Sequence, residues 1–130
     1  MSELLKVEMK NRLLAIAAAT EALTGLVLIV YPPLVIKLLF AAEIAGVGVV
    51  ISRFAGLALV ALGVACWPCG PASRALCGML TYSSLATLGL FYIALGGEWK
   101  GLLLWPAVAL HAVLTLFLAW AWVKANQTMS

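Results

Sequence analysis

The stretch LLAIAAATEALTGLVLIVYPP, residues 13–33, is the part of the chain that decides its fold. A helix needs about 20 mostly apolar residues to cross roughly 30 Å of hydrocarbon, and residues 13–31 supply that length. Pro32 and Pro33 end the helix, because proline lacks the backbone N–H and clashes with the preceding turn. The stretch therefore predicts a transmembrane helix with one charged residue, Glu21, inside it.

The composition of the whole chain gives the same indication. Of its 130 residues, 65% are hydrophobic and 10% are charged, whereas about 25% are charged in ordinary soluble domains. Three further stretches have a similar length and apolar character, namely residues 45–66, 75–95 and 102–123. We therefore expect an all-α integral membrane four-helix bundle that forms one transmembrane domain over residues 1–130. The first apolar run is too long for the core of a cleavable signal peptide.

The segment between the first two expected spans has a different character. Residues 32–44, PPLVIKLLFAAEI, are apolar apart from single charges at Lys37 and Glu43. A short amphipathic stretch of this kind is typical of a helix that lies in the membrane interface. We predict a short interfacial helix here, with a simple loop as the alternative.

Lysine and arginine residues indicate the orientation of the expected helices. The side that holds both termini and the loop after the second span carries Lys6, Lys10, Arg12, Arg74 and Lys124. The opposite side carries Lys37 and Lys100. Because positive residues favour the cytoplasmic side of a membrane, we expect both termini in the cytoplasm.

Glu21 is a candidate site residue because of its depth. It lies nine residues beyond Arg12, which is roughly 13 Å along a helix. A charge at such a depth costs on the order of 2.5–3.5 kcal/mol on insertion scales. Its neighbours one turn away are all small: Ala17, Ala18, Thr24 and Gly25. Small residues mark helix contact faces in membranes, so Glu21 is predicted to point into the bundle.

Arg53 is the expected partner of Glu21, since it is the opposite charge at comparable depth in the second span. His111 in the fourth span and Tyr82 in the third reach a similar level and complete the candidate cluster. One interpretation is a structural ion pair that fixes the helix register. The other is a small polar pocket for a ligand, a proton or a quinone head group, since intramembrane ionisable residues are site candidates.

The stretch CWPC, residues 66–69, has the C-x-x-C spacing of a redox pair. On the expected topology, Cys66 and Cys69 face the cytoplasm, where thiols are kept reduced. The surrounding loop also has too few cysteines and histidines for the four ligands that zinc usually takes. We interpret the stretch as a structural turn held by residues 70–71, with a redox role for Cys66 and Cys69 as the alternative.

The stretch RFAGLALVALG, residues 53–63, resembles the second helix of small DoxX-like bacterial inner-membrane proteins. GLLLWPAVALHAVL, residues 101–114, looks like the last helix of relatives in that group. The resemblance implies an α-helical bundle in the bacterial inner membrane, and some members are linked to quinone or respiratory oxidoreductase systems. It assigns no catalytic residue to this chain, and the CWPC stretch is not part of the shared pattern.

Several function classes have no support in the sequence. The net charge of +3 is spread over termini and loops, so nucleic-acid binding is not expected. Neither a catalytic triad nor a phosphate-binding loop is recognisable, and the sequence identifies no cofactor. We expect a non-catalytic protein, either an accessory subunit of a larger membrane complex or homo-oligomer, or a binder of a small hydrophobic molecule. The alternative is a quinone-linked redox or proton-coupled transport protein that uses Glu21, Arg53 and His111.

Overall fold

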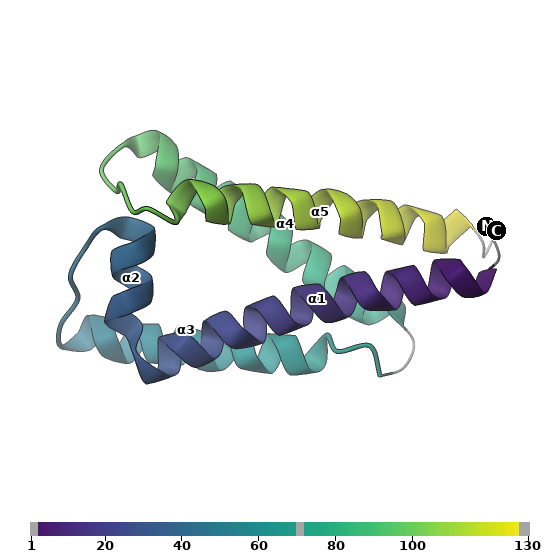
Figure 1. Cartoon of the computed structure of the whole chain (residues 1–130), viewed down its shortest axis with the longest axis horizontal. Coiled ribbons are helices and arrows are strands. Elements are labelled where there is room, and N and C mark those ends of the chain that lie inside the picture. The colour runs from purple at the N-terminus through teal and green to yellow at the C-terminus, as the bar shows by residue number, and fades with distance from the viewer. Residues whose placement is uncertain (1–2, 70–71, 128–130) are drawn as a thin grey trace.

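The computed structural model of the chain describes residues 3–69 and 72–127. Over these residues the fold is all-helical, without a β-strand. Its helices are α1 (Glu3–Val30), α2 (Pro32–Phe40), α3 (Val47–Ala65), α4 (Ala72–Gly96) and α5 (Leu104–Gln127). Figure 1 shows their arrangement along the longest axis of the molecule.

The four long helices, α1, α3, α4 and α5, are each long and apolar enough to cross a membrane. Their outer surfaces carry large apolar side chains that the fold leaves uncovered, for example Leu23, Ile51, Leu88 and Leu116, each at least 63% exposed. Soluble proteins rarely expose so much contiguous apolar surface. The chain thus has the helices of a multi-pass membrane protein, and each predicted span overlaps one of these helices.

The largest difference from the predicted spans is at the start of α1. This helix begins at Glu3 rather than near residue 13, so it is about 42 Å long at 1.5 Å per residue. That exceeds the roughly 30 Å of hydrocarbon in a bilayer. The additional turns contain two ion pairs within the helix, Lys6 with Glu3 and Arg12 with Glu8, each at 2.6 Å.

The short helix predicted after the first span is present as α2. It has proline at its first positions, where the missing N–H is tolerated. It ends at Phe40, earlier than residue 44, because Ala41 adopts a left-handed conformation with φ of 54°. The backbone N–H of Leu103, just before α5, donates to the carbonyl oxygen of Leu38 at 2.8 Å. This bond ties the end of α2 to the beginning of α5.

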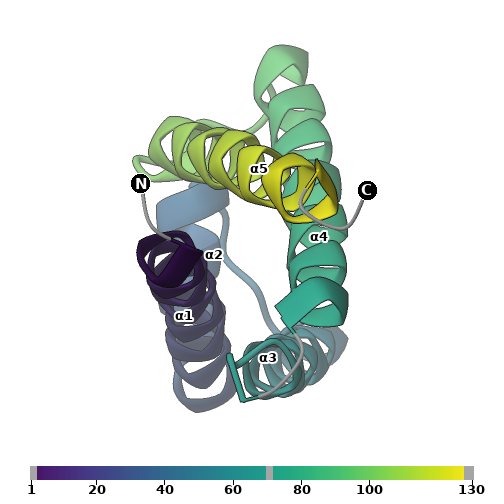
Figure 2. The same ribbon diagram turned by 90° about the vertical axis from the view of Figure 1, so that its right-hand side faces the viewer.

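The long helices form two pairs, α1 with α3 and α4 with α5. The two pairs meet near the first turns of α1 and the last turns of α5, and they diverge toward α2 (Figure 1). Figure 2, viewed along the helices, shows α1 and α3 together on one side of the molecule and α4 crossing α5 on the other. Short α2 lies across the open end between them.

Glycine residues bring α1 and α3 into backbone contact. A Cβ atom placed on Gly25 would lie 2.5 Å from the carbonyl oxygen of Gly56, and one on Gly63 would lie 2.6 Å from that of Ala18. Larger side chains therefore do not fit at these positions. Close approach through small residues is a common way for membrane helices to associate.

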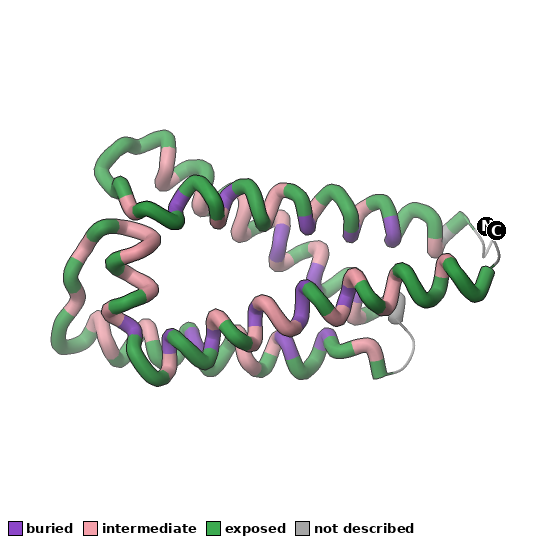
Figure 3. Tube along the Cα trace, viewed as in Figure 1, coloured by how far each residue is buried: buried purple, intermediate pink, exposed green. Residues whose placement is uncertain are grey.

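The closed end, where the two pairs meet, contains the main hydrophobic core. Its buried residues come from α1, α4, α5 and the end of α3: Leu14, Ala17, Ala18, Cys66, Leu76, Met79, Leu114, Leu118 and Ala121. Figure 3 shows buried residues along the α1–α3 contact and on the inward side of α5. The core therefore seals one end of the space between the pairs.

Candidate functional site

A cleft of about 800 Å³ lies between the two helix pairs, on the α2 side of the core. We name it the central cleft. Its walls are formed by α1 (Thr20 to Leu28), α2 (Leu34 to Leu39), α4 (Tyr82 to Ile93) and α5 with the residue before it (Leu103 to His111), with Leu59 contributed by α3. Most of these side chains are apolar, so the cleft is hydrophobic and contains few polar groups.

The polar groups gather at the inner end of the central cleft. Glu21, Tyr82 and His111 lie at the ends of the lining stretches of their helices that are nearest the core. Counted from the α2 side, Glu21 is about 14 Å along α1 and His111 about 10 Å along α5. We call these three residues the polar floor of the cleft. The sequence predicts a cluster of Glu21, Arg53, His111 and Tyr82, and the structure brings three of these four residues together.

Glu21 and His111 face each other without completing a hydrogen bond. Oε1 of Glu21 lies 3.7 Å from Nδ1 of His111, and the two side chains are only 3% and 12% exposed. Neither of these two atoms has a hydrogen-bond partner in the described part of the chain. Buried polar atoms are usually paired, so the floor has unused capacity for a hydrogen-bonding group.

Tyr82 contacts both His111 and Glu21. Its ring packs edge-on against the imidazole of His111, with ring centroids 5.9 Å apart and planes inclined by 75°. Its hydroxyl group also interacts with the carboxyl group of Glu21. Three helices thus contribute one side chain each to the floor, and α4 orients the two titratable groups of α1 and α5.

Two threonines of α1 add polar atoms to the cleft wall. The hydroxyl of Thr20 donates to the carbonyl oxygen of Ile16, and that of Thr24 donates to the carbonyl oxygen of Thr20, both at 2.9 Å. Their hydrogens are therefore used within the helix, whereas each oxygen keeps lone pairs that can accept a bond. The α1 wall offers acceptors rather than donors.

The expected pairing of Glu21 with Arg53 is wrong. Arg53 is exposed on the outer side of α3, and among the described residues it forms no ion pair. It lies six residues from the start of α3, about 9 Å along the helix. Arginine side chains at such depths extend toward the membrane surface. Arg53 therefore belongs to the exposed surface of α3 and not to the polar floor.

No disulfide joins the cysteines in this structure. All three are free thiols, with Cys66 buried and Cys69 and Cys77 exposed. Cys66 follows the last residue of α3 and belongs to the core, and burial raises the pKa of its thiol. Residues 70–71, predicted to hold the turn, lie outside the described residues. Within the described ranges, no group of three or more possible metal ligands is present.

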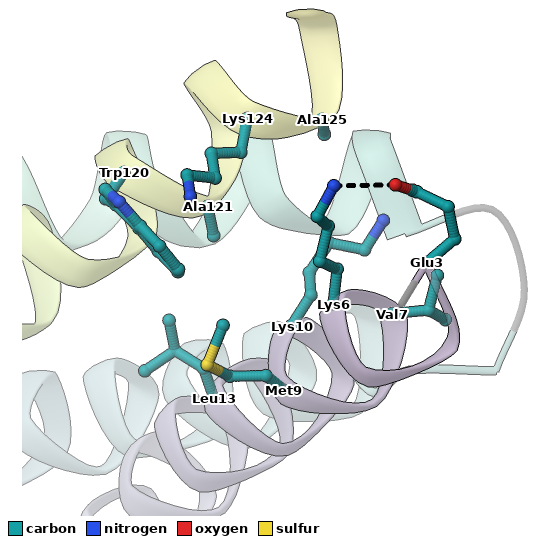
Figure 4. A pocket seen from close by; sticks show the side chains of 10 residues that line it. All are labelled: Glu3, Lys6, Val7, Met9, Lys10, Leu13, Trp120, Ala121, Lys124 and Ala125. Carbon is teal, nitrogen blue, oxygen red and sulfur yellow. Dashed lines mark hydrogen bonds and ion pairs between the residues drawn. The ribbon is translucent and has the colours of Figure 1, made fainter. Parts of the chain in front are cut away.

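A second, smaller pocket of about 80 Å³ lies at the closed end of the molecule, between the start of α1 and the end of α5 (Figure 4). Two of its three basic residues are engaged, since Lys6 pairs with Glu3 and Lys124 stacks over the ring of Trp120 at 4.6 Å. This pocket gathers basic residues from both ends of the chain on one side of the molecule.

Sequence reasoning did not identify the contribution of α2 to the site. Leu34 and Leu38, and likewise Val35 and Leu39, are separated by four residues and lie on the cleft side of α2. Such spacing places residues on one face of a helix. The signal was present, but an interfacial helix is equally expected to turn an apolar face toward lipid.

Comparison with known proteins gives no family model that matches the chain, and no significant match among curated proteins or solved structures. The similarity to DoxX-like proteins accordingly stays a prediction from the sequence. The central cleft and its residues are therefore the basis for a proposed function.

Proposed function

We propose that this protein binds a small hydrophobic molecule in the central cleft, within the bacterial inner membrane. The observation that carries the proposal is the combination of an apolar cleft with a polar floor whose hydrogen-bonding atoms are unpaired. Ligand pockets typically measure about 300–1,000 Å³ and contain a few polar groups within apolar walls. The central cleft has both properties.

The ligand would lie with its polar group at the floor and its apolar part toward α2. Leu34, Leu38 and Leu90 provide an apolar surface on the α2 side of the cleft. Glu21 and His111 provide the polar end. A molecule that enters from lipid keeps its apolar part in a similar environment, so recognition depends mainly on the floor.

Binding without catalysis is the role proposed here, whether the protein acts alone or as an accessory subunit. The exposed apolar sides of the four long helices suit contact with lipid and with other membrane helices. A redox or proton-coupled function would use the same polar floor, but Arg53 would take no part in it.

The proposed orientation places both termini in the cytoplasm, because Lys6, Lys10 and Lys124 gather at the closed end. Cys69, which is exposed, reports on this end of α3. A membrane-impermeant maleimide applied to intact cells should leave Cys69 unlabelled. A cysteine placed at Lys100 in a cysteine-free background should react. The reverse pattern would overturn the orientation.

A cleft-filling variant tests the binding function. Gly89 lies on the cleft wall, and a Cβ atom added there meets no atom within 4 Å. Gly89→Leu therefore places a bulky side chain in the cleft without disturbing a helix contact. Gly96→Leu is the matched control, because Gly96 also has open space around it but does not line the cleft.

The readout is photolabelling of the purified protein with an uncharged aromatic diazirine, followed by mapping of the adducts by mass spectrometry. We expect adducts on the lining residues of α2 and α4, strongly reduced in Gly89→Leu and unchanged in Gly96→Leu. Equal labelling of these residues in all three proteins would show that the cleft does not bind apolar molecules.

A further inference from the structure

The central cleft has an unbalanced charge. Among the residues that line it, Glu21 is the only acidic one, and no lysine or arginine is present. His111 is the one basic group nearby, and it is neutral unless protonated. When Glu21 is ionised, the lining of the cleft therefore has the charge of one carboxylate with no fixed cation to balance it.

This carboxyl group is buried and incompletely paired. Glu21 is 2% exposed, and its Oε1 atom accepts no hydrogen bond from the described residues. A buried carboxylate without a partner is strongly disfavoured, whereas one that meets a cation is not. Arg53 is in α3, the helix that pairs with α1, but it is exposed and forms no ion pair with Glu21 among the described residues.

The other polar atoms around Glu21 favour the same kind of partner. Thr20 and Thr24 have already donated their hydroxyl hydrogens, so they turn oxygen lone pairs toward a ligand. Tyr82 contributes an aromatic ring to the same floor. Oxygen acceptors and aromatic rings both attract positive groups, the rings through their quadrupole.

We propose that the ligand of the central cleft is a hydrophobic organic cation, such as a lipophilic ammonium or phosphonium ion. Its positive centre would lie against Glu21 at the polar floor, and its apolar groups would fill the space between α2, α4 and α5. This inference rests on the proposed binding function and adds the charge of the ligand to it.

A pair of probes with matching shape and opposite charge tests this inference. Tetraphenylphosphonium and tetraphenylborate have the same four phenyl groups around a central atom, so that the apolar cleft can distinguish them only by charge. Binding of each ion to the detergent-purified protein is measured by equilibrium dialysis. The Gly89→Leu variant, with its cleft obstructed, gives the background from partitioning into detergent.

We expect the phosphonium ion to bind the wild-type protein above this background and the borate ion not to do so. Glu21→Gln, which keeps the size of the side chain, should weaken phosphonium binding by about tenfold or more, a factor that corresponds to about 1.4 kcal/mol. Arg53→Met is the control for a change of charge elsewhere in the membrane and should leave binding unchanged. His111→Gln should not weaken it, because a protonated histidine competes with the ligand for Glu21.

Other outcomes separate the two proposals. Equal binding of both ions, abolished by Gly89→Leu, would overturn the charge inference and leave the binding function in place. The same conclusion follows if Glu21→Gln has no effect, or if His111→Gln and Glu21→Gln weaken binding equally. If neither the two ions nor the uncharged diazirine distinguishes wild type from Gly89→Leu, the binding function itself is wrong.

Discussion

Two parts of α1 meet the rest of the molecule in opposite ways. On the side of Gly25, α1 touches α3 so closely that backbone atoms are in contact. On the side of Glu21, the same helix faces a cleft of about 800 Å³. Glu21 and Gly25 are four residues apart and only about 40° apart around the helix, so the tight interface and the open cleft adjoin each other on α1.

The comparison shows that glycine has two different roles in this chain. At Gly25, Gly56 and Gly63 it allows a close approach of two helices, and any side chain would collide with backbone atoms. At Gly89 it leaves space, and an added side chain would project into the cleft. The amino-acid sequence does not show which role a given glycine has, but replacing each glycine with a larger residue does.

The largest effect is expected from filling the tight interface. Gly56→Leu would place a Cβ atom 2.6 Å from the carbonyl oxygen of Gly25, with further atoms beyond it. The backbone cannot move away without separating the helices, so we expect a loss of about 3 kcal/mol or more in unfolding free energy. Denaturation in mixed micelles measures this loss.

The same substitution at Gly89 is the counterpart in the open region. Because leucine is a better helix former than glycine, Gly89→Leu should keep or increase stability by up to about 1 kcal/mol. Comparable destabilisation of both variants would mean that the cleft is filled in the folded protein.

Removal of the buried carboxyl group comes next in size. Glu21→Met should stabilise the protein by about 1–2 kcal/mol, because the carboxyl group is buried without a complete set of partners. Glu21→Gln keeps a polar group and should give a smaller gain. If Glu21 were instead held in a satisfied ion pair, Glu21→Met would cost about 3–5 kcal/mol in the same measurement.

A double substitution tests whether the outer side of α3 communicates with the cleft. Glu21→Met and Arg53→Met should be additive within about 0.5 kcal/mol, because Arg53 is exposed and does not share a partner with Glu21. A coupling of more than about 1 kcal/mol between them in micelle denaturation would restore the direct pair that the sequence predicts.

The smallest change in stability is expected at the exposed cysteine. Cys69→Ser should alter the unfolding free energy by less than about 0.5 kcal/mol, because the thiol is exposed and unbonded. Cys66 should react more slowly than Cys69 with a maleimide, since its thiol is buried and has a raised pKa. Similar rates for both thiols would show that the end of α3 is not packed in the core.

The helices could be predicted from the sequence because lipid imposes a simple requirement on length. Apolar runs fixed the long helices, and the proline pair after Tyr31 fixed the end of α1. The additional turns at the start of α1 were not found, because they carry charges at Glu3 and Lys6. Hydropathy identifies the part of a helix inside lipid and does not report how far it continues in water.

The sequence predicted how deep the site residues lie along their helices, but it did not predict which way their side chains face. Glu21 lies three residues from Ala18, and Arg53 lies three residues from Gly56, so each is about 60° around its helix from a contact with the partner helix. The sequence gives this angle but not the side to which the two helices turn. In the structure Glu21 faces the cleft and Arg53 faces outward.

The pairing of α1 with α3 also affects how the protein is made. Both helices precede α4 and α5 in the chain, so their glycine contact can form as soon as α3 has entered the membrane. At that moment the helices that carry Tyr82 and His111 have not yet packed against α1, and Glu21 lacks its later neighbours. A ribosome that stops before α5 would release a product with a bare carboxyl group in the bilayer, which is the kind of defect that membrane quality control can recognise. Arrival of α4 and α5 therefore completes the polar floor of the central cleft.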